Sequence, residues 1–548
     1  MSRRLSPSRS ARGMGSAVLA AAFLLAIVVV GEPAGAGDRV VSVKLAGADG
    51  GTEPRIAVGP DGRRWVVTNA GGREVVYSSA DGLKWTRTRS DPKQLLATID
   101  VDIVVTRTGR VIVSELDDVA VSFRTSYSDD GGATWKESRG TTLPDTDRQW
   151  LAVGPDDPVT RLPRVYLLFH NLFAGVVTHN VFAMTSTDNG ATFGPPIPVT
   201  LPGSREWLDL QCGDSTGPSS LTVNMTTGRL YAKWGTRTSA VGGCGAQPPG
   251  VNVVGATRAW VATSPDNSLG SWTSSLAVDD SKTGQVVEMQ FSPAAIDSDG
   301  TVYVVYPESP DSYPNYDGAA IKVTWAPPDL SRWSQPVTVV PAGGPGNILP
   351  HIAAGEPGMV DVAYLRGVAR RDKSPAWFLT VAQSTNLFSG SPTFRTSYAS
   401  SIPAYTGSAS ELMGVCGPGG PLAGLAQGLL CGRSTDVWGI TLDDACLYSV
   451  TWPTVKNKAP GSNPGTFVAT QIDGQSACAT AKSSPANLSV DVLAKKVRNG
   501  AKLPATGATS GNEGLLLFAA AVGLACWLRF ATHRDARRVP GERSRKPG

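Results

Sequence analysis

The chain has 548 residues, of which 41% are hydrophobic and 18% charged, with a formal net charge of +4. Its two arginine-rich ends carry this positive charge, so the region between them is close to neutral or slightly acidic, which argues against nucleic acid as a partner. The 61 glycines and 14 tryptophans, without a convincing amphipathic helix between the ends, favour many short strands joined by turns.

The first 36 residues have the order of a secretory signal peptide. A basic stretch that includes Arg3 and Arg12 precedes an apolar run at residues 17–30. Ala34-Gly35-Ala36 then fits the small-x-small rule for cleavage, so the mature chain is expected to begin near Gly37. The alternative is a retained N-terminal anchor, for which the apolar run is short.

Seven hairpins follow, each with a β-rich segment, a Gly/Asp turn and a Val/Tyr-rich segment. They fall at residues 55–67, 102–113, 150–168, 221–232, 294–305, 351–363 and 437–450. Each hairpin with its outer strands makes a four-stranded unit, and units that repeat in this way are typical of propeller blades. We therefore expect an all-β propeller over residues 37–480, with seven blades favoured and six plus an accessory hairpin as the alternative. Residues 40–45 are expected to pair with the last blade and close the ring.

Two near-copies of one turn lie between the hairpins, Ser128–Trp135 and Ser186–Phe193, and both read Ser-x-Asp-x-Gly-x-Thr-aromatic. The short polar side chains bond nearby backbone, the glycine tolerates positive φ, and the aromatic ring buries beneath the turn. The pattern resembles the Asp box, or bacterial neuraminidase repeat, of sialidases and many secreted β-propellers. Decayed copies fall at 79–85, 264–272, 329–333 and 384–394. The resemblance implies a scaffold and leaves the activity open.

Six of the seven cysteines lie in the exported region, and Cys526 lies in the C-terminal apolar run. An even number in an oxidising compartment favours disulfides, and neighbours in sequence are the preferred pairs. A metal site is the rival interpretation, but no Cys-x2-Cys or His pair has ligand spacing, so neither metal nor cofactor is predicted. The expected pairs are Cys212 with Cys244, Cys416 with Cys431, and Cys446 with Cys478.

The C-terminal region contains a polar linker, residues 481–502, and then a three-part signal over 503–548. Leu503-Pro504-Ala505-Thr506-Gly507 precedes an apolar segment at 515–528 and a basic tail. This order resembles the sorting signal of Gram-positive surface proteins, which implies that a sortase cuts between Thr506 and Gly507 and joins the chain to cell-wall peptidoglycan. The apolar segment is expected to be a membrane helix before sorting, and a plain tail anchor is the alternative. Both place the protein at the outer face of the cell.

The candidate ligand site follows from the propeller itself, since such pockets usually lie over the axis at the starts of the innermost strands. Charged residues just before the hairpins could bind an anionic ligand, and paired arginines suit a carboxylate. The alternative is that they cap strand ends or pair with one another. These residues are Glu53, Arg55, Asp100, Asp102, Asp147, Arg148, Arg205, Asp209, Glu288, His351 and Asp436.

Sialidase resemblance implies three arginines that grip a carboxylate, a Tyr–Glu nucleophile and an Asp acid/base. Pro54-Arg55-Ile56 keeps the Arg-Ile of the first-arginine motif but lacks its final proline, and neither Tyr364 nor Tyr405 has a clear Glu partner. The catalytic set is therefore a hypothesis, whose members are Arg55, Asp100, Asp102, Arg148, Arg205 and Tyr364.

Residues 50–470 resemble secreted actinobacterial sialidase-like propellers, most closely at 147–153, at 354–364 and in the loop from Cys416 to Cys431. The main hypothesis is a surface module that binds glycan or protein ligands over the axis. The alternatives are an exo-sialidase that removes terminal acidic sugars, and a structural protein without a ligand. Whether the protein is an enzyme depends on which charged groups converge in space.

Overall fold

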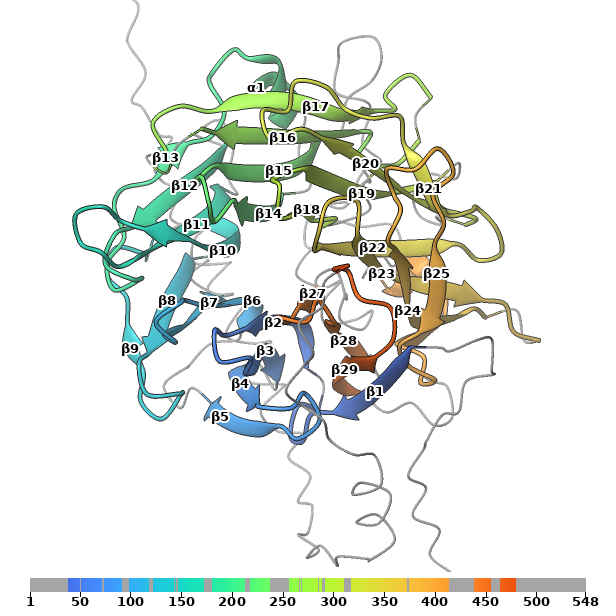
Figure 1. Cartoon of the computed structure of the whole chain (residues 1–548), viewed down its shortest axis with the longest axis horizontal. Helices are drawn as coiled ribbons and strands as arrows, with labels where there is room; N and C mark the ends of the chain where they lie inside the picture. The colour runs from blue at the N-terminus through green and yellow to red at the C-terminus, as the bar shows by residue number, and fades with distance from the viewer. Residues whose placement is uncertain are drawn as a thin grey trace, which may run out of the picture. The chain divides into compact units, whose positions relative to one another are not determined.

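The computed structural model describes residues 38–479, except 50, 71–72, 91–97, 118–121, 142, 144–145, 172–179, 212–216, 237–255, 266, 268, 284, 288–290, 310–316, 372–373, 413–437 and 455–463. This part of the chain forms seven antiparallel sheets arranged as blades around a central axis (Figure 1). The prediction of an all-β propeller with seven blades is thus confirmed.

Each blade is a four-stranded meander whose first strand in the chain is innermost, except that the last blade takes its outer strand from the N-terminus. Blade 1 contains β2 (Thr52–Val58), β3 (Arg64–Ala70), β4 (Arg73–Ser79) and β5 (Thr86–Ser90). Blade 2 contains β6 (Thr98–Val105), β7 (Val111–Asp117), β8 (Ser122–Ser128) and β9 (Lys136–Glu137). Blade 3 contains β10 (Thr146–Asp156), β11 (Pro163–Asn171), β12 (Val181–Ser186) and β13 (Ile197–Pro198). Blade 4 contains β14 (Pro218–Val223), β15 (Leu230–Thr236), β16 (Arg258–Ser264) and β17 (Thr273–Asp279).

The remaining blades follow the same order. Blade 5 contains β18 (Ala294–Ile296), β19 (Val302–Glu308), β20 (Ala320–Ala326) and β21 (Val337–Val340). Blade 6 contains β22 (Asn347–Ala354), β23 (Val360–Val368), β24 (Ala376–Ser384) and β25 (Arg395–Tyr398), with β26 (Tyr405–Thr406) also paired to β24. Blade 7 contains β27 (Gly439–Leu442), β28 (Tyr448–Thr454), β29 (Gly465–Asp473) and β1 (Arg39–Lys44). Two short helices are described, α1 (Arg205–Leu210) and α2 (Ala409–Leu412).

The core lies between the faces of neighbouring blades, so both faces of the middle strands are buried. Trp65 and Val67 of β3, for example, share one cluster with Ile103 of β6 and Val113 of β7. A strand that is buried on both faces has a nearly continuous run of apolar residues in its sequence. This burial explains the apolar sequence of segments such as Val302–Tyr306.

The ring closes where the two ends of the propeller meet. β1 pairs with β29 over six residues, from Arg39↔Asp473 to Lys44↔Phe467. The expected pairing of residues 40–45 with the last blade is confirmed for Val40–Lys44. Without β1 the outer edge of β29 would present unpaired N–H and C=O groups.

Both full Asp boxes adopt the turn expected from their sequence. In the second, the backbone N–H of Gly190 donates to Ser186 Oγ at 2.8 Å, and the Thr192 hydroxyl donates to Asp188 Oδ2 at 2.6 Å. The first repeats these bonds with Ser128, Asp130 and Thr134. Both turns follow the third strand of a blade, at the end of the axis opposite to the starts of the inner strands.

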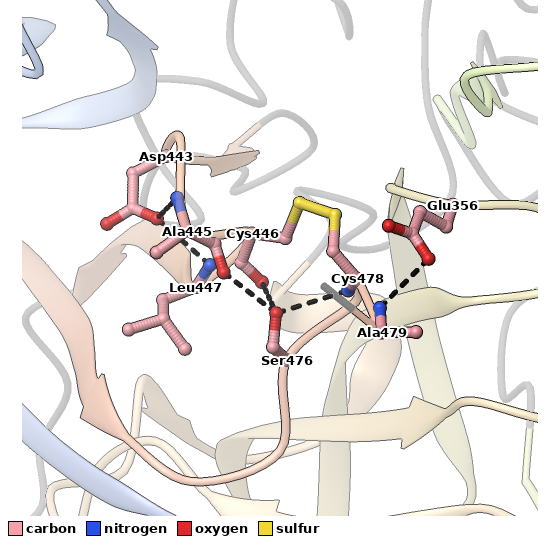
Figure 2. Close-up of a disulfide and its surroundings, with 8 residues drawn as sticks. All are labelled: Glu356, Asp443, Ala445, Cys446, Leu447, Ser476, Cys478 and Ala479. Atoms are coloured by element: carbon pink, nitrogen blue, oxygen red, sulfur yellow. Dashed lines mark hydrogen bonds between the residues drawn. A yellow bond between two sulfur atoms is a disulfide. The ribbon is translucent and has the colours of Figure 1, made fainter. Parts of the chain in front are cut away.

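A segment at residues 474–479, which we call the clasp, lies across the seam between blades 6 and 7. Figure 2 shows Cys478 of the clasp joined by a disulfide to Cys446, which precedes β28, while the Ala479 N–H donates to Glu356 Oε2 of blade 6 at 2.9 Å. This confirms one predicted disulfide; Cys212, Cys244, Cys416 and Cys431 lie outside the described residues.

The predicted signal peptide, the linker, the sorting residues 503–507 and the apolar segment with Cys526 also lie outside the described residues. Within the described part, no helix has the length and apolar character needed to cross a bilayer.

Two buried carboxyl side chains, those of Asp38 and Asp361, lie at the seam. Asp38, just before β1, accepts a 2.8 Å hydrogen bond from the Gln475 N–H. It also forms an ion pair with Arg395. Asp361 of β23 is 1% exposed and accepts a 3.0 Å bond from Gln383. Burial and, to a lesser extent, the charge of Asp38 raise the pKa of Asp361 to about 7, against the opposing effect of the bond from Gln383.

Removal of β1 tests the ring closure. A chain that begins at Leu45 should lose about 3–5 kcal/mol of unfolding free energy, because six paired residues and the Asp38 contacts disappear. Urea unfolding would measure the loss. A chain that begins at Arg39 keeps β1 but lacks Asp38, so it measures the part of the lost unfolding free energy that is due to the Asp38 contacts. An unchanged midpoint for the Leu45 chain would show that the pairing does not hold the ring.

The pH dependence of the seam gives a second prediction. The folded-state pKa of Asp361, about 7, lies above the usual value of an unfolded Asp. The contribution of protonated Asp361 to the free energy of unfolding is therefore fully present below about pH 4. This contribution is lost as the pH rises through 7. Asp361→Asn should raise the free energy of unfolding by about 2–4 kcal/mol at pH 8 and change it little at pH 4. The exposed-turn variant Asp299→Asn is the control, and equal effects of Asp361→Asn at both pH values would contradict the prediction.

Candidate functional site

Five of the seven inner strands share an irregularity at the end where each begins. The ladder register shifts between Thr52 and Arg55 in β2, and at corresponding places in β6, β10, β14 and β22. Three residues at these bulges have left-handed backbone conformations, with φ of 50° at Glu53, 54° at Arg148 and 53° at Leu349. Non-glycine residues in this region carry backbone strain, which the surrounding contacts must offset. Such bulges redirect side chains, and in blades 1 and 3 the redirected residues are charged.

Arg55 lies directly after the bulge of β2 and is held by three different blades. Its Nε donates to Asp102 Oδ1 of β6 at 2.9 Å, and its Nη1 donates to the carbonyl of Trp438 at 2.8 Å. Its guanidinium lies 4.8 Å from the ring centre of Trp150 in β10. Asp102 is itself fixed, because the Leu151 N–H donates to its Oδ2 at 2.7 Å. The arginine is thus positioned by groups that are already ordered.

Arg148 forms the centre of a second group of charges. Its Nη1 lies 3.2 Å from Glu53 Oε2 and 3.0 Å from Asp100 Oδ1, and its guanidinium lies 4.2 Å from the ring centre of Phe291. Glu53, Asp100 and Arg148 are all buried. Three consecutive blades therefore contribute to one cluster of ionisable groups.

Asp147 and His170 extend this cluster across blade 3. They are opposite one another in the β10–β11 ladder, with 3.8 Å between Asp147 Oδ2 and His170 Nε2. The backbone N–H of Arg148 donates to Asp147 Oδ1 at 2.8 Å. Burial alone would raise the pKa of Asp147, but the interactions with His170, first among them hydrogen bonding and charge, and the charge of Arg148 lower that pKa below its usual range.

His351 brings blade 6 to the same end of the axis. Its ring stacks on Trp438 with 4.2 Å between ring centres, and it is 1% exposed. Burial, with the positive charges of Arg55 and Lys233, lowers the pKa of His351 well below its usual range, so the imidazole is neutral at pH 7. Its Nε2 has no hydrogen-bond partner in the described part of the chain.

The structure brings Arg55, Asp100, Asp102 and Arg148 together and keeps the other two catalytic candidates apart from them. Arg205 lies in α1 and pairs with Asp279 of blade 4 at 3.2 Å. Tyr364 is fully buried in the core cluster around β19, β20 and β23, where burial raises its pKa to about 12.

The remaining predicted residues are distributed as follows. Asp209 pairs with Arg258 at 3.1 Å, and Tyr405 belongs to the core cluster that includes Trp438. Glu288 and Asp436 lie outside the described residues.

Sequence reasoning missed His170, Phe291 and Trp438. The predicted residues are charged and lie at the starts of inner strands, whereas His170 lies at the end of a returning strand and the other two are aromatic. The one sequence signal for His170 is the pairing of the β10–β11 hairpin, which places residue 170 opposite Asp147. In the residues that the structure describes, no group of three or more His, Cys, Asp or Glu side chains is arranged to hold a metal ion.

No protein-family profile matches the chain, and no curated protein matches it in sequence. Solved structures match it in fold. A family PL25 ulvan lyase bound to -[GlcA(1-4)Rha3S]- is 11% identical, with a TM-score of 0.47, over 78% of this chain and 95% of its own. The GH93 α-L-arabinofuranosidase of Fusarium graminearum with arabinobiose is 10% identical, with a TM-score of 0.38, over 77% and 92%. A Dyadobacter fermentans protein of unknown function is 14% identical, with a TM-score of 0.39, over 60% and 93%. Likeness at this level concerns the scaffold alone.

Proposed function

We propose that the protein binds an acidic glycan at the end of the axis where the inner strands of blades 1–3 begin. The observation that carries this proposal is the state of Arg55. Its side chain is 19% exposed, and its Nη2 makes no hydrogen bond to any described residue, while Nε and Nη1 are both engaged. A guanidinium fixed in this way offers N–H donors to a carboxylate or sulfate at little further cost in conformational entropy.

The surroundings of Arg55 strengthen this site for an anion. The Trp150 ring lies against the guanidinium and is almost fully buried, so water is kept from that side of the guanidinium and its attraction for an anion is less screened. Arg148 contributes less to the attraction for an anionic ligand, because the Glu53 and Asp100 carboxyl groups already contact its guanidinium. This arrangement supports a single-arginine contact with an acidic sugar and gives no specific support to a three-arginine sialic acid grip.

Hydrolysis of a glycosidic bond is the second candidate. Glu53 and Asp100 contact the same nitrogen of Arg148, at 3.2 and 3.0 Å, so the two contacting carboxyl oxygens are at most about 6 Å apart. This range includes the separation of about 5–5.5 Å between the carboxyl groups of retaining glycosidases. The burial of Glu53 and Asp100 argues for a structural ion-pair network instead, which is why binding is the first proposal.

Substitution of Arg55 tests the binding proposal. With sialyllactose or a glucuronate-containing disaccharide as titrant, calorimetry should show that Arg55→Ala weakens affinity about 10–100-fold through loss of charged hydrogen bonds. Arg55→Lys should recover only part of this affinity because its ammonium lacks the planar donor fork. Neutral lactose should bind weakly to every form.

The matched control is Arg205→Ala, which removes an exposed arginine outside the site. Melting temperatures must accompany the titrations, because Arg55→Ala leaves Asp102 buried without its guanidinium. Equal affinity for lactose and sialyllactose, or no effect of Arg55→Ala, would overturn the proposal. Turnover of a fluorogenic sialoside or uronide, lost in Glu53→Gln while binding persists, would favour hydrolysis.

We also propose that the protein is exported, sorted through Leu503–Gly507 and attached to peptidoglycan, with the linker as a spacer. The order of pentapeptide, apolar segment and basic tail supports this proposal. In cell fractionation, Thr506→Ala should move most of the protein from the wall to the membrane or medium. Ala505→Ser, which changes only the variable position of the motif, should leave it in the wall. Unchanged wall attachment of Thr506→Ala would refute sorting.

A further inference from the structure

His351 has the same place in blade 6 as Arg55 has in blade 1 and Trp150 in blade 3. Each is the first residue to resume ladder pairing after the bulge at the start of an inner strand. In all three bulges, a residue with positive φ lies two positions before it. Because bulges of this kind redirect the side chains beside them, the shared geometry gives these three side chains corresponding positions around the axis.

Trp438, the residue before β27, connects His351 to the site at Arg55. Its carbonyl oxygen accepts the 2.8 Å hydrogen bond from Arg55 Nη1. Its ring centre lies 4.2 Å from that of the His351 ring. One residue of blade 7 therefore contacts both the arginine that we propose as the anion-binding group and the histidine.

Two polar atoms in this stack of rings have no hydrogen-bond partner among the described residues. They are His351 Nε2 and Trp438 Nε1, and both side chains are almost fully buried. Buried polar groups are nearly always hydrogen-bonded, because an unpaired one loses its hydration without compensation. The indole nitrogen only donates, whereas a neutral imidazole has one donor and one acceptor nitrogen. An O–H group both donates and accepts, so it suits either atom.

The protonation state of His351 narrows the role of its ring. Burial and nearby positive charge lower the pKa of His351 well below its usual range. The neutral ring adds no attraction for an anion, and a base with so low a pKa is a weak proton acceptor in catalysis. A charged ligand group at Nε2 would be costly to bury. The remaining role for Nε2 is a hydrogen bond to a neutral hydroxyl group.

We infer that His351 is a specificity-determining residue of the ligand site, whose Nε2 hydrogen-bonds a hydroxyl of the same sugar that places its carboxylate on Arg55. This inference rests on the proposed function and narrows its ligand to hydroxylated acids, as opposed to carboxylates in general. Because Nε2 is buried, the hydroxyl reaches it only with a small movement of the side chains. Arg55 supplies the affinity for the charge, and His351 supplies the discrimination between acids.

Calorimetry of the full chain with two carboxylates tests this division of roles. Methyl β-glucuronide has a carboxylate and ring hydroxyls, whereas cyclohexanecarboxylate has the carboxylate alone. His351→Phe keeps a planar ring and removes both nitrogens. It should lower the ratio of glucuronide to cyclohexanecarboxylate affinity about 5–50-fold, through loss of the hydroxyl contact. His351→Gln, which returns an amide near the place of Nε2, should restore part of this ratio.

The matched variant is Arg55→Ala, which should weaken both acids and change their ratio less than about 3-fold. His351→Phe should keep its melting temperature within about 2 °C, because an apolar ring replaces an unpaired polar one. An unchanged ratio in His351→Phe, with binding that still depends on Arg55, would overturn this inference and leave the proposed function standing. Failure of the native chain to bind either acid would refute the proposed function and this inference with it.

Nitrogen-15 NMR separates a ligand hydroxyl from a water molecule as the partner of Nε2. The chain has four histidines, and His351→Phe assigns the signals of His351. Saturation with methyl β-glucuronide should shift the Nε2 signal, and saturation with cyclohexanecarboxylate should leave it in place. A signal that neither acid shifts would show that water alone serves this nitrogen, and would overturn the inference.

Discussion

The pairing of β1 with β29 is the constraint on which the rest of the structure depends. A sheet that ends in an open edge has unsatisfied backbone groups, and a propeller removes this problem only when its last blade is completed. Here the completing strand comes from the opposite end of the domain, so residues 39–44 and 465–473 must find each other. Closure then sets the seven inner strands around one axis (Figure 1) and brings their bulged starts together at one end.

Local patterns made much of this architecture predictable. An Asp box is completed by bonds within about eight residues, as between Ser186 and Gly190, so sequence alone specifies it. The hairpins and the closing strand were also predictable from the patterns of strand-forming residues. The Cys446–Cys478 disulfide was predictable because the two cysteines are neighbours in the sequence. The site was less predictable because its contacts cross blades: the bond from Arg55 to Trp438 spans 383 residues.

Arg205 shows why a repeated motif misleads. Arg205-Glu206-Trp207-Leu208 looks like Arg148-Gln149-Trp150-Leu151, yet the first stretch is α1 and the second is β10. Ser204 caps the helix by accepting a 3.3 Å bond from the Trp207 N–H, and Glu206 in the first turn suits the helix dipole. In β10, ladder pairing with β11 overrides any such preference. Strained backbone at Arg148, rather than its sequence, places that side chain among the charges.

The disulfide of the clasp has a mechanical consequence. A pulling force on the chain beyond Ala479 meets the Ala479–Glu356 hydrogen bond and then reaches Cys478, where it passes through the Cys446 bridge into the turn before β28 (Figure 2). The covalent bond shields the clasp residues between Cys478 and β29 from tension. The β1–β29 ladder is therefore not peeled open one hydrogen bond at a time, and the load is carried by the middle of blade 7. A load applied at the C-terminal end of the chain would therefore leave the β1–β29 ring closure unstrained.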